Sequence, residues 1–356
     1  MPKPKKVQET KKAFRVGYAA LIGRPNVGKS TLLNRLLGQK IAIVSSKPQT
    51  TRISILGIHT TDKGQIIFID NPGIHKPLHN LNKRMMDFVY SSLETANLIC
   101  LLIDATEKYG HGDEFVLEML KNVRTPIFLL INKVDIVKKE NILLMIDQYK
   151  DLLHFKEIIP ISAVRGTNLD VLEKLIYESL PESEKIYSDD EISDQSERFL
   201  LAEIIREKVL NHVEKELPWV TAVYIDAIER RGPQAEEAQG ERVQPTDSRE
   251  RNETLPEAGE RTRGVKQAEK TAEPRLAGLE KKRPVIYIKA TIFVERDSHR
   301  IIIIGRRGQL IKTIGIEARR EIEEILDAKV YLDLHVKVRE NWRDSADVLD
   351  LIEGQK

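Results

Sequence analysis

The stretch GRPNVGKS at Gly23 to Ser30 decides how the first half of this chain folds. It follows the apolar run YAALI and precedes TLLNRLLG, which has helical spacing, so it lies between a predicted strand and a predicted helix. Backbone amides in such a turn point at phosphate oxygens, and the helix dipole favours their negative charge. We therefore predict a P-loop nucleotide site. Its residues are Gly23, Arg24, Pro25, Asn26, Val27, Gly28, Lys29, Ser30 and Thr31.

Two side chains of this loop have defined chemistry. Lys29 reaches the β- and γ-phosphates of a bound nucleotide, and the hydroxyl of Ser30 ligates magnesium. The loop by itself does not distinguish ATP from GTP. The base must therefore be inferred from sequence further along the chain.

Three downstream elements select guanine. The stretch DNPG follows the apolar run QIIFI, which brings the Asp70 carboxylate near magnesium and the Gly73 amide near a γ-phosphate. The stretch NKVD follows PIFLLI, and its Asp135 carboxylate can accept two hydrogen bonds from guanine that adenine cannot supply. The stretch SAVRG offers the Ala163 amide to the guanine O6 atom. The other predicted GTP-binding residues here are Asn132, Lys133 and Ser162.

The polar stretch SSKPQTTRISI, between the P-loop and Asp70, has the composition of a switch segment. A switch needs a hydroxyl that binds magnesium only while the γ-phosphate is present. Two adjacent threonines are candidates, and we assign this role to Thr51 in preference to Thr50. The predicted magnesium ligands are therefore Ser30, Thr51 and Asp70.

Residues 16–181 have the pattern of one α/β domain. Apolar runs alternate with amphipathic stretches, and the runs LICLLI and IFLLI are uninterrupted, as in strands covered on both faces. The pattern predicts a three-layer fold with a parallel sheet between helices. The polar, acidic segment 182–197 has no periodicity and is interpreted as a linker.

The sequence pattern of residues 198–345 predicts a smaller α+β domain. Apolar residues three and four apart predict a helix over 200–217 that ends at Pro218. Alternating patterns predict strands, and a further helix follows Gly308. The predicted strands are 219–228, 286–294 and 330–338.

Three segments lie outside the predicted elements. Residues 231–283 contain no aromatic and few aliphatic residues, so they are predicted to be a disordered insertion. Residues 1–15 are predicted to be a basic flexible tail. Residues 346–356 are predicted to be a C-terminal tail.

The stretch IIIIGRRGQLIKTIG, residues 301–315, contains a second turn suited to anions. A GxxG turn that enters a helix brings backbone close to a nucleic-acid strand, and the helix dipole favours phosphate. With its helix and closing strand, this turn matches a KH domain, whose narrow groove holds about four unpaired nucleotides. The predicted RNA-binding residues are Ile304, Gly305, Arg306, Arg307, Gly308, Gln309 and Lys312. The predicted floor of the groove is Ile303, Ile304, Ile311 and Ile314.

Composition limits the cellular setting. The formal net charge is +2, so a nucleic-acid surface must be a local patch. One cysteine, Cys100, excludes an internal disulfide and fits a reducing compartment. No stretch resembles a signal peptide or a membrane span, so we expect a cytoplasmic protein. We also expect it to be a monomer. The lysine-rich start is interpreted as a solvated tail, with peripheral contact at the inner face of the plasma membrane as the alternative.

The sequence resembles the Era family of bacterial Ras-like GTPases, within the TRAFAC class. The resemblance rests on GRPNVGKSTLLN, PQTTR, GIHT, DNPGIHKP, NKVD, ISA, SDQSERFLLAEIIRE, VERDS and IIGRRGQLIK. It covers almost the whole chain except the opening tail and the insertion. It implies a P-loop G domain followed by a type II KH domain, with GTP or GDP and Mg²⁺ as ligands.

The resemblance also implies partners. These are the 3′ end of 16S ribosomal RNA and the small ribosomal subunit, whose assembly the protein would assist. Two features depart from the family pattern: the insertion 231–283 replaces a short connection, and Asn71 stands where threonine is common. The insertion leaves the GTP site untouched but puts the geometry of ribosome docking in question.

Ile74 bears on hydrolysis, because Ras-type enzymes have at this position a glutamine that orients the attacking water. Families that resemble this one and have an apolar residue here often use potassium, held partly by the P-loop asparagine, which is Asn26. We hypothesise potassium-stimulated hydrolysis; the alternative is that Asn26 only shapes the turn. The predicted catalytic residues are Asn26, Lys29, Thr51 and Gly73.

Two other functions stay open at this point. Ile74 is compatible with an RNA-binding adaptor that holds GTP with negligible hydrolysis. A GTPase that acts on transfer RNA is the second alternative, although the KH-like half argues against it. The choice of RNA over DNA follows only from the family resemblance.

Overall fold

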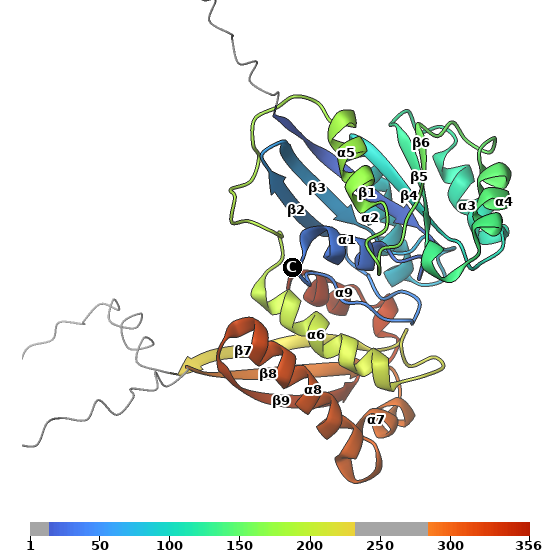
Figure 1. The fold of residues 1–356 in the computed structure, drawn as a ribbon. Coiled ribbons are helices and arrows are strands. Elements are labelled where there is room, and N and C mark those ends of the chain that lie inside the picture. The colour runs from blue at the N-terminus through green and yellow to red at the C-terminus, as the bar shows by residue number, and fades with distance from the viewer. Residues whose placement is uncertain (1–13, 232–283) are drawn as a thin grey trace, which may run out of the picture.

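A computed structural model shows the fold of residues 14–231 and 284–356 (Figure 1). Residues 1–13 of the predicted tail and residues 232–283 of the predicted insertion lie outside these described residues, whereas Arg231, expected in the insertion, belongs to a strand. The described residues form two sheets, one of six strands and one of three. Each sheet organises its own set of helices.

The larger sheet is parallel except at one edge. Its strand order is β2-β3-β1-β4-β5-β6, and only the pair of β2 and β3 is antiparallel. The strands are β1 (Arg15–Gly23), β2 (Ile55–Thr61), β3 (Gly64–Asp70), β4 (Leu98–Asp104), β5 (Ile127–Asn132) and β6 (Glu157–Pro160). The predicted P-loop α/β fold is confirmed. The edge strand β2 is not among the predicted strands, because its sequence ILGIHTT contains no long apolar run.

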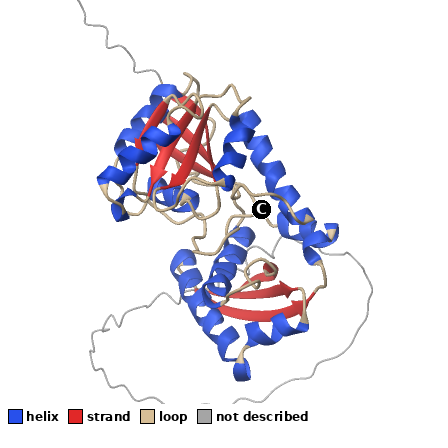
Figure 2. Ribbon diagram, turned by 90° about the vertical axis from the view of Figure 1, so that its right-hand side faces the viewer, coloured by secondary structure: helices blue, strands red, loops and turns tan. Residues whose placement is uncertain are grey.

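Helices cover both faces of this sheet (Figure 2). They are α1 (Lys29–Leu37), α2 (Asn80–Thr95), α3 (His111–Leu120), α4 (Lys139–Tyr149) and α5 (Leu169–Ser179). On one face Leu32 of α1 and Leu172 of α5 are buried in one cluster. On the other face Val89 of α2 and Val116 of α3 are buried in a second cluster. The sheet is therefore the middle of three layers.

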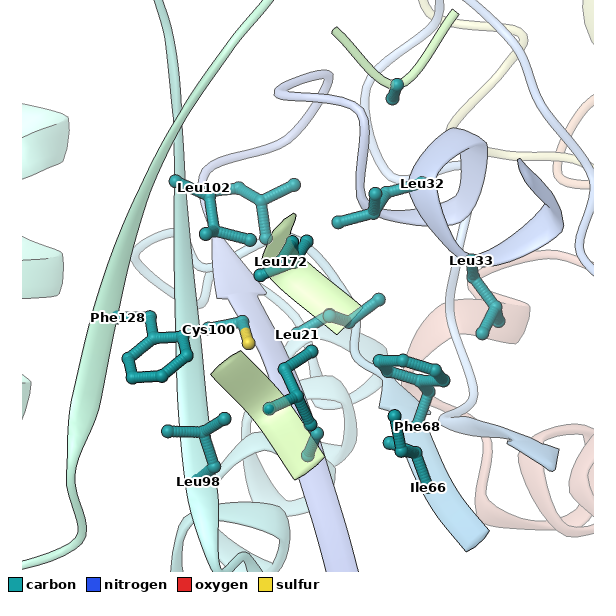
Figure 3. Close-up of a cluster of buried hydrophobic side chains, with 14 of the residues drawn as sticks. Leu21, Leu32, Leu33, Ile66, Phe68, Leu98, Cys100, Leu102, Phe128 and Leu172 are labelled. Atoms are coloured by element: carbon teal, nitrogen blue, oxygen red, sulfur yellow. The ribbon is translucent and has the colours of Figure 1, made fainter. Parts of the chain in front are cut away.

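Every residue of β4 is buried, as its uninterrupted apolar run predicts. Cys100 in this strand lies among Leu21, Leu98 and Phe128 (Figure 3). Burial raises the pKa of its thiol to about 12, so it is a packing residue and not a reactive one.

The second unit packs most of its helices against one face of a three-stranded sheet. Strand order is β7-β8-β9, with β7 and β8 antiparallel and β8 and β9 parallel. Ile204, Ile288, Ile314 and Ile322 are buried together in its core. The elements are α6 (Glu197–His212), β7 (Ala222–Arg231), β8 (Val285–Val294), α7 (Asp297–Ile304), α8 (Gln309–Leu326), β9 (Lys329–Val338) and α9 (Ala346–Glu353). This is the predicted α+β arrangement.

Some predicted boundaries are wrong. Helix α6 ends at His212 and not at Pro218, because Val213 has extended backbone dihedral angles and turns follow it. The apolar residues before the GxxG turn form α7, which is not among the predicted elements. Arg15, expected in the flexible tail, begins β1.

Residues 346–353, expected in a C-terminal tail, form α9 between the two units (Figure 1). Leu349 of α9 and Trp342 are buried with Leu81 and Met85 of α2. Arg84 of α2 also donates to Asp350 and Glu353 at 2.7 and 2.8 Å. The end of the chain therefore fastens the second unit to the first. Across the described ranges, none of the helices has the length and apolarity that a bilayer span requires.

Candidate functional site

The P-loop connects β1 to α1 and is shaped by its backbone. Gly28 has a φ of 98°, and a Cβ there would lie 2.4 Å from the Asn132 side chain, so the turn requires glycine. Lys29 Nζ donates to the carbonyls of Gly23 and Arg24 at 3.3 and 3.0 Å. Burial lowers the pKa of Lys29 to about 8. The ammonium is thus held at the mouth of the loop, where P-loop lysines meet phosphate.

Three side-chain oxygens converge beside Lys29. Ser30 Oγ donates to Asp70 Oδ2 at 2.6 Å and lies 2.9 Å from Thr51 Oγ1. Thr51 Oγ1 also lies 3.4 Å from Asp70 Oδ2. The structure therefore brings together the three residues predicted to bind magnesium, although they come from α1, the switch segment and β3.

The donor set of this cluster fits a hard cation. Asp70 is fully buried, its Oδ1 atom has no hydrogen-bond partner, and burial raises the pKa of its carboxyl to about 6. A magnesium ion would neutralise this buried carboxylate and would take the two hydroxyl oxygens as ligands. Within the described residues, no group of three or more His, Cys, Asp or Glu could hold a metal. A cation here would depend on Ser30, Thr51, Asp70 and phosphate oxygens.

Gly73 lies directly against the P-loop. A Cβ on Gly73 would lie 2.7 Å from three atoms of Pro25, so any larger residue would push the two loops apart. The next amide, from Ile74, donates to the carbonyl of Gly23 at 3.0 Å. The Ile74 side chain is buried in the core with Ile22 and Met86 and cannot orient a water at the phosphate site.

Asn26 connects the P-loop to the switch segment. Its side-chain nitrogen donates to the carbonyl of Ser46 at 2.8 Å, and its backbone has a positive φ of 65°. Because the nitrogen is used in this bond, the amide oxygen is the atom that could ligand a cation. Asn26 therefore both shapes the turn and contacts the switch.

The residues predicted to recognise the base lie together at the ends of β5 and β6. Asn132 donates to the carbonyl of Val27 at 2.8 Å and accepts from the amide of Ala163 at 3.0 Å. Ser162 Oγ donates to Asp135 Oδ1 at 2.6 Å, which holds this carboxylate in place. Lys133, whose φ is 66°, pairs with Asp104 at 2.5 Å. Asn132 therefore connects the predicted base site to the P-loop.

A cleft of about 480 Å³ runs from Lys133 to Thr51. The guanidinium of Arg24, a predicted GTP-binding residue, pairs with Glu107 and Asp113 at 2.9 and 3.0 Å, so its side chain positions the loop and a contact with phosphate would come from its backbone. Ser45, Ser46 and Gln49 of the predicted switch segment also line the cleft. Other lining residues were not predicted, because no motif marks them; they are Ile43, Val44, Asp104, Thr106 and Glu107.

Arg52, next to Thr51, leaves the nucleotide site and enters the second unit. Its guanidinium donates to the carbonyls of Pro218, Trp219 and Thr221 at 2.9, 3.1 and 2.7 Å, and it lies 5.6 Å from the ring centre of Trp342. The residue is only 7% exposed. Burial, followed by the neighbouring charge of Arg206, lowers the pKa of Arg52 to about 9, which leaves it charged at neutral pH. Arg52 is not among the residues to which the sequence assigns a role.

Helix α6 holds the switch segment from the other side. Arg206 donates to the carbonyl of Thr50, and Glu207 accepts from the amide of Val44 at 3.0 Å. Glu207 also binds Lys40 at 2.6 Å. The same helix packs on β7 and α8, so the switch segment is in direct contact with the core of the second unit.

The GxxG turn projects between α7 and α8. Gly305 and Gly308 have positive φ angles of 73° and 75°, and a Cβ on Gly305 would lie 2.7 Å from Leu310. Arg306 and Arg307 are exposed at the tip. The turn therefore presents backbone and positive charge at the start of α8, as predicted.

A groove of about 320 Å³ follows this turn, between α8 and β9. Two residues predicted to form its floor, Ile303 and Ile314, are instead fully buried in the core of the second unit, because they lie on the inner faces of α7 and α8. The groove is lined by Ile311, Lys312, Gly315, Ile316, Arg319, Tyr331, Leu332 and Leu334.

Both parts of the chain match known protein families. Residues 18–133 match the family described as 50S ribosome-binding GTPase, and residues 264–343 match the KH domain family. The chain is similar to Era in a crystal structure with MgGDPNP and nucleotides 1506–1542 of 16S ribosomal RNA. The identity is 37%, the TM-score is 0.78, and the match covers 95% of this chain and 98% of that chain. The chain belongs to the Era family of GTPases.

A second solved structure supports the Era assignment. A point variant of Aquifex aeolicus Era bound to GDP·AlF4⁻ is 36% identical, with a TM-score of 0.78 and coverage of 95% of this chain and 99% of that chain. Membership of the Era family makes this chain a GTPase. It sets aside both an adaptor without hydrolysis and a GTPase that acts on transfer RNA.

The contact of Gly73 with Pro25 gives a test of the Era-type site. We expect Gly73→Ala to lower kcat/KM for GTP hydrolysis by about tenfold to a hundredfold, because the clash costs about 1–3 kcal/mol and displaces the amide that is predicted to contact the γ-phosphate. GDP affinity should change less, since GDP has no γ-phosphate. Phosphate release and equilibrium binding of labelled nucleotides measure the two effects.

The matched control is Gly110→Ala. A Cβ on Gly110 would have no atom within 4 Å, and its backbone is extended. Equal hydrolysis by the Gly73 and Gly110 variants would show that the contact with Pro25 does not position the catalytic loop.

Proposed function

We propose that this chain is a GTP-hydrolysing switch that binds the 3′ end of 16S ribosomal RNA through its KH domain and assists assembly of the small ribosomal subunit. The observation that carries this proposal is the match, over 95% of the chain, to Era bound to MgGDPNP and a 16S ribosomal RNA fragment. The P-loop cluster and the GxxG groove of this chain supply the two corresponding sites.

Each nucleotide-binding residue has a role in the proposal. Lys29 binds the β- and γ-phosphates, and Ser30, Thr51 and Asp70 hold magnesium, which neutralises charge on the phosphates. The carboxylate of Asp135 accepts hydrogen bonds from guanine, and Ser162 fixes its orientation. The Ala163 amide, which contacts Asn132 in this structure, would turn to the guanine O6 atom.

Hydrolysis in this proposal uses a potassium ion in place of a water-orienting glutamine. The burial of Ile74 removes that position from the chemistry. Asn26 lies at the P-loop with its amide oxygen free to bind a cation, and its bond to Ser46 would place the switch segment beside the ion. A second cation there would stabilise charge that develops during phosphoryl transfer.

The switch segment would carry the nucleotide state to the KH domain. Thr51 is proposed to bind magnesium only while the γ-phosphate orders the segment. The adjacent Arg52 is buried among carbonyls of 218–221, so a shift of Thr51 must move or strain this contact. GTP would thereby bias the position of the domain that binds RNA.

Cation exchange tests the catalytic part of the proposal. We expect hydrolysis to be at least about tenfold faster in potassium than in sodium at equal ionic strength, because a bound cation replaces a stabilising donor. Asn26→Ala should hydrolyse GTP at the same rate in potassium and in sodium. Asn26→Asp should remain faster in potassium, because a side-chain oxygen is still present. Steady-state phosphate release measures both variants, and equal wild-type rates in the two salts would exclude the potassium site.

Charge reversal at the GxxG turn tests the RNA part. We expect Arg306→Asp with Arg307→Asp to weaken binding of an RNA equivalent to nucleotides 1506–1542 of 16S ribosomal RNA by at least about tenfold. The salt dependence of binding should also become shallower, since each lost phosphate contact lowers its slope by about 0.7 for a single strand. Arg320→Asp is the matched control, because Arg320 is an exposed residue of α8 that does not line the groove.

Recovery of 16S ribosomal RNA by crosslinking in living cells completes this test. Crosslinking with sequencing should recover 16S ribosomal RNA with the wild type and the Arg320 variant, and lose it with the double variant. Unchanged recovery by the double variant would reject the GxxG turn as the RNA site.

A further inference from the structure

Two tyrosines stack on the outer face of the KH sheet. Tyr287 of β8 and Tyr331 of β9 are direct register partners, and their ring centres lie 5.3 Å apart with planes at 13°. Tyr331 is the outer ring of the pair and is 62% exposed. One face of its ring is covered by Tyr287, and its exposure leaves area for a further planar group.

The ring of Tyr287, the inner one of the pair, is held in place by polar contacts. The hydroxyl of Tyr287 donates to Asp333 Oδ2 at 3.0 Å, and the same carboxylate oxygen lies 3.0 Å from His335 Nε2. Tyr331 therefore rests on a fixed support. A ring that is already positioned loses little conformational entropy when a ligand stacks on it.

The pair lies at the end of the groove that is far from the GxxG turn. Helix α8 runs antiparallel to β9, so Gly315 lies beside Leu334, and Arg319, one turn later, lies level with the start of β9. Both Arg319 and Tyr331 line the groove. A strand that enters at Gly308 and follows α8 therefore leaves the groove beside Tyr331.

Positive charge accompanies the exposed ring. Arg319 is exposed and forms no ion pair with any residue of the described ranges. Its guanidinium can therefore contact the phosphate that precedes or follows a base on Tyr331. An aromatic face next to an unpaired arginine is the combination that single-stranded nucleic acids use on binding proteins.

We propose that Tyr331, supported by Tyr287 and accompanied by Arg319, binds one further RNA base by stacking, beyond the nucleotides held in the KH groove. This inference rests on the proposed RNA-binding function. The subsite takes any base, because every base has a π-face, and it lengthens the single-stranded segment that the domain holds.

The test uses the full chain and a ladder of single-stranded RNAs from the 3′ end of 16S ribosomal RNA. The shortest has about four nucleotides, the length that a KH groove holds, and the others are longer by one nucleotide at a time at either end. Wild-type affinity should rise in one step as the RNA reaches Tyr331. Tyr331→Ala should lose about 5-fold to 150-fold of affinity for the longer RNAs and bind the shortest one as the wild type does.

Two variants separate stacking from other effects. Tyr331→Phe keeps the ring and should retain the step. Tyr90→Ala removes an exposed tyrosine from α2 and should behave as wild type. Photocrosslinking of 5-iodouridine, placed at the nucleotide that produces the step, should label Tyr331, as read by mass spectrometry.

The results of these experiments distinguish failure of the stacking subsite from failure of the RNA-binding function. An unchanged step in Tyr331→Ala, an equal loss for all RNA lengths, or a wild-type ladder without a step would each overturn the stacking subsite while leaving the groove intact. If the wild type binds none of the RNAs, the proposed RNA-binding function itself is rejected, and the subsite with it. The same follows if the Arg306→Asp, Arg307→Asp double variant binds the RNAs as tightly as the wild type.

Discussion

Two neighbouring residues, Thr51 and Arg52, link the nucleotide site to the second domain. Thr51 contacts Ser30 and Asp70, while Arg52 is buried against the carbonyls of 218–221. Because the two residues are adjacent, a backbone shift that moves Thr51 relative to Ser30 and Asp70 also displaces Arg52 relative to these carbonyls. The buried guanidinium also cannot leave its carbonyls at little cost, since a buried charge without partners is strongly unfavourable. This constraint would couple the proposed phosphate sensor to the second domain.

Helices α6 and α9 surround this link. Helix α6 belongs to the core of the KH domain, yet its Arg206 and Glu207 bind the backbone of the switch segment. Helix α9 and Trp342 pack against α2, which follows the loop that carries Gly73. Both loops that would sense the γ-phosphate thus lead into elements that contact the second domain. The groove between α8 and β9 lies on the far side of α8, so such a change in position would also move the proposed RNA site.

Sequence predicted the sites whose residues are contiguous or follow strands. GRPNVGKS and IIGRRGQLIK each contain the glycines, charges and helix start that define their turns, and these local requirements can be read from spacing alone. The magnesium cluster was predictable because the carboxyl ends of parallel strands meet at one edge of a sheet.

Other features depend on contacts between distant parts of the chain. Arg52 appears as an ordinary polar switch residue until Pro218 and Trp342 are placed around it. Ile303 and Ile314 have the composition of a groove floor, but only the packing of α7 and α8 decides that they face the core. The stack of Tyr287 on Tyr331 requires the register of two strands that are separated by a helix, a turn and a second helix.

The most direct test measures the distance between the domains. Spin labels at Leu144→Cys and Ile301→Cys occupy exposed positions on α4 and α7, and the buried Cys100 will not react with the label. In the wild type, replacing GDP by a non-hydrolysable GTP analogue should shift the distance distribution from pulsed electron resonance. Arg52→Ala should bind both nucleotides and give the same broad distribution with each. The same nucleotide-dependent shift in the Arg52 variant would contradict transmission through this residue.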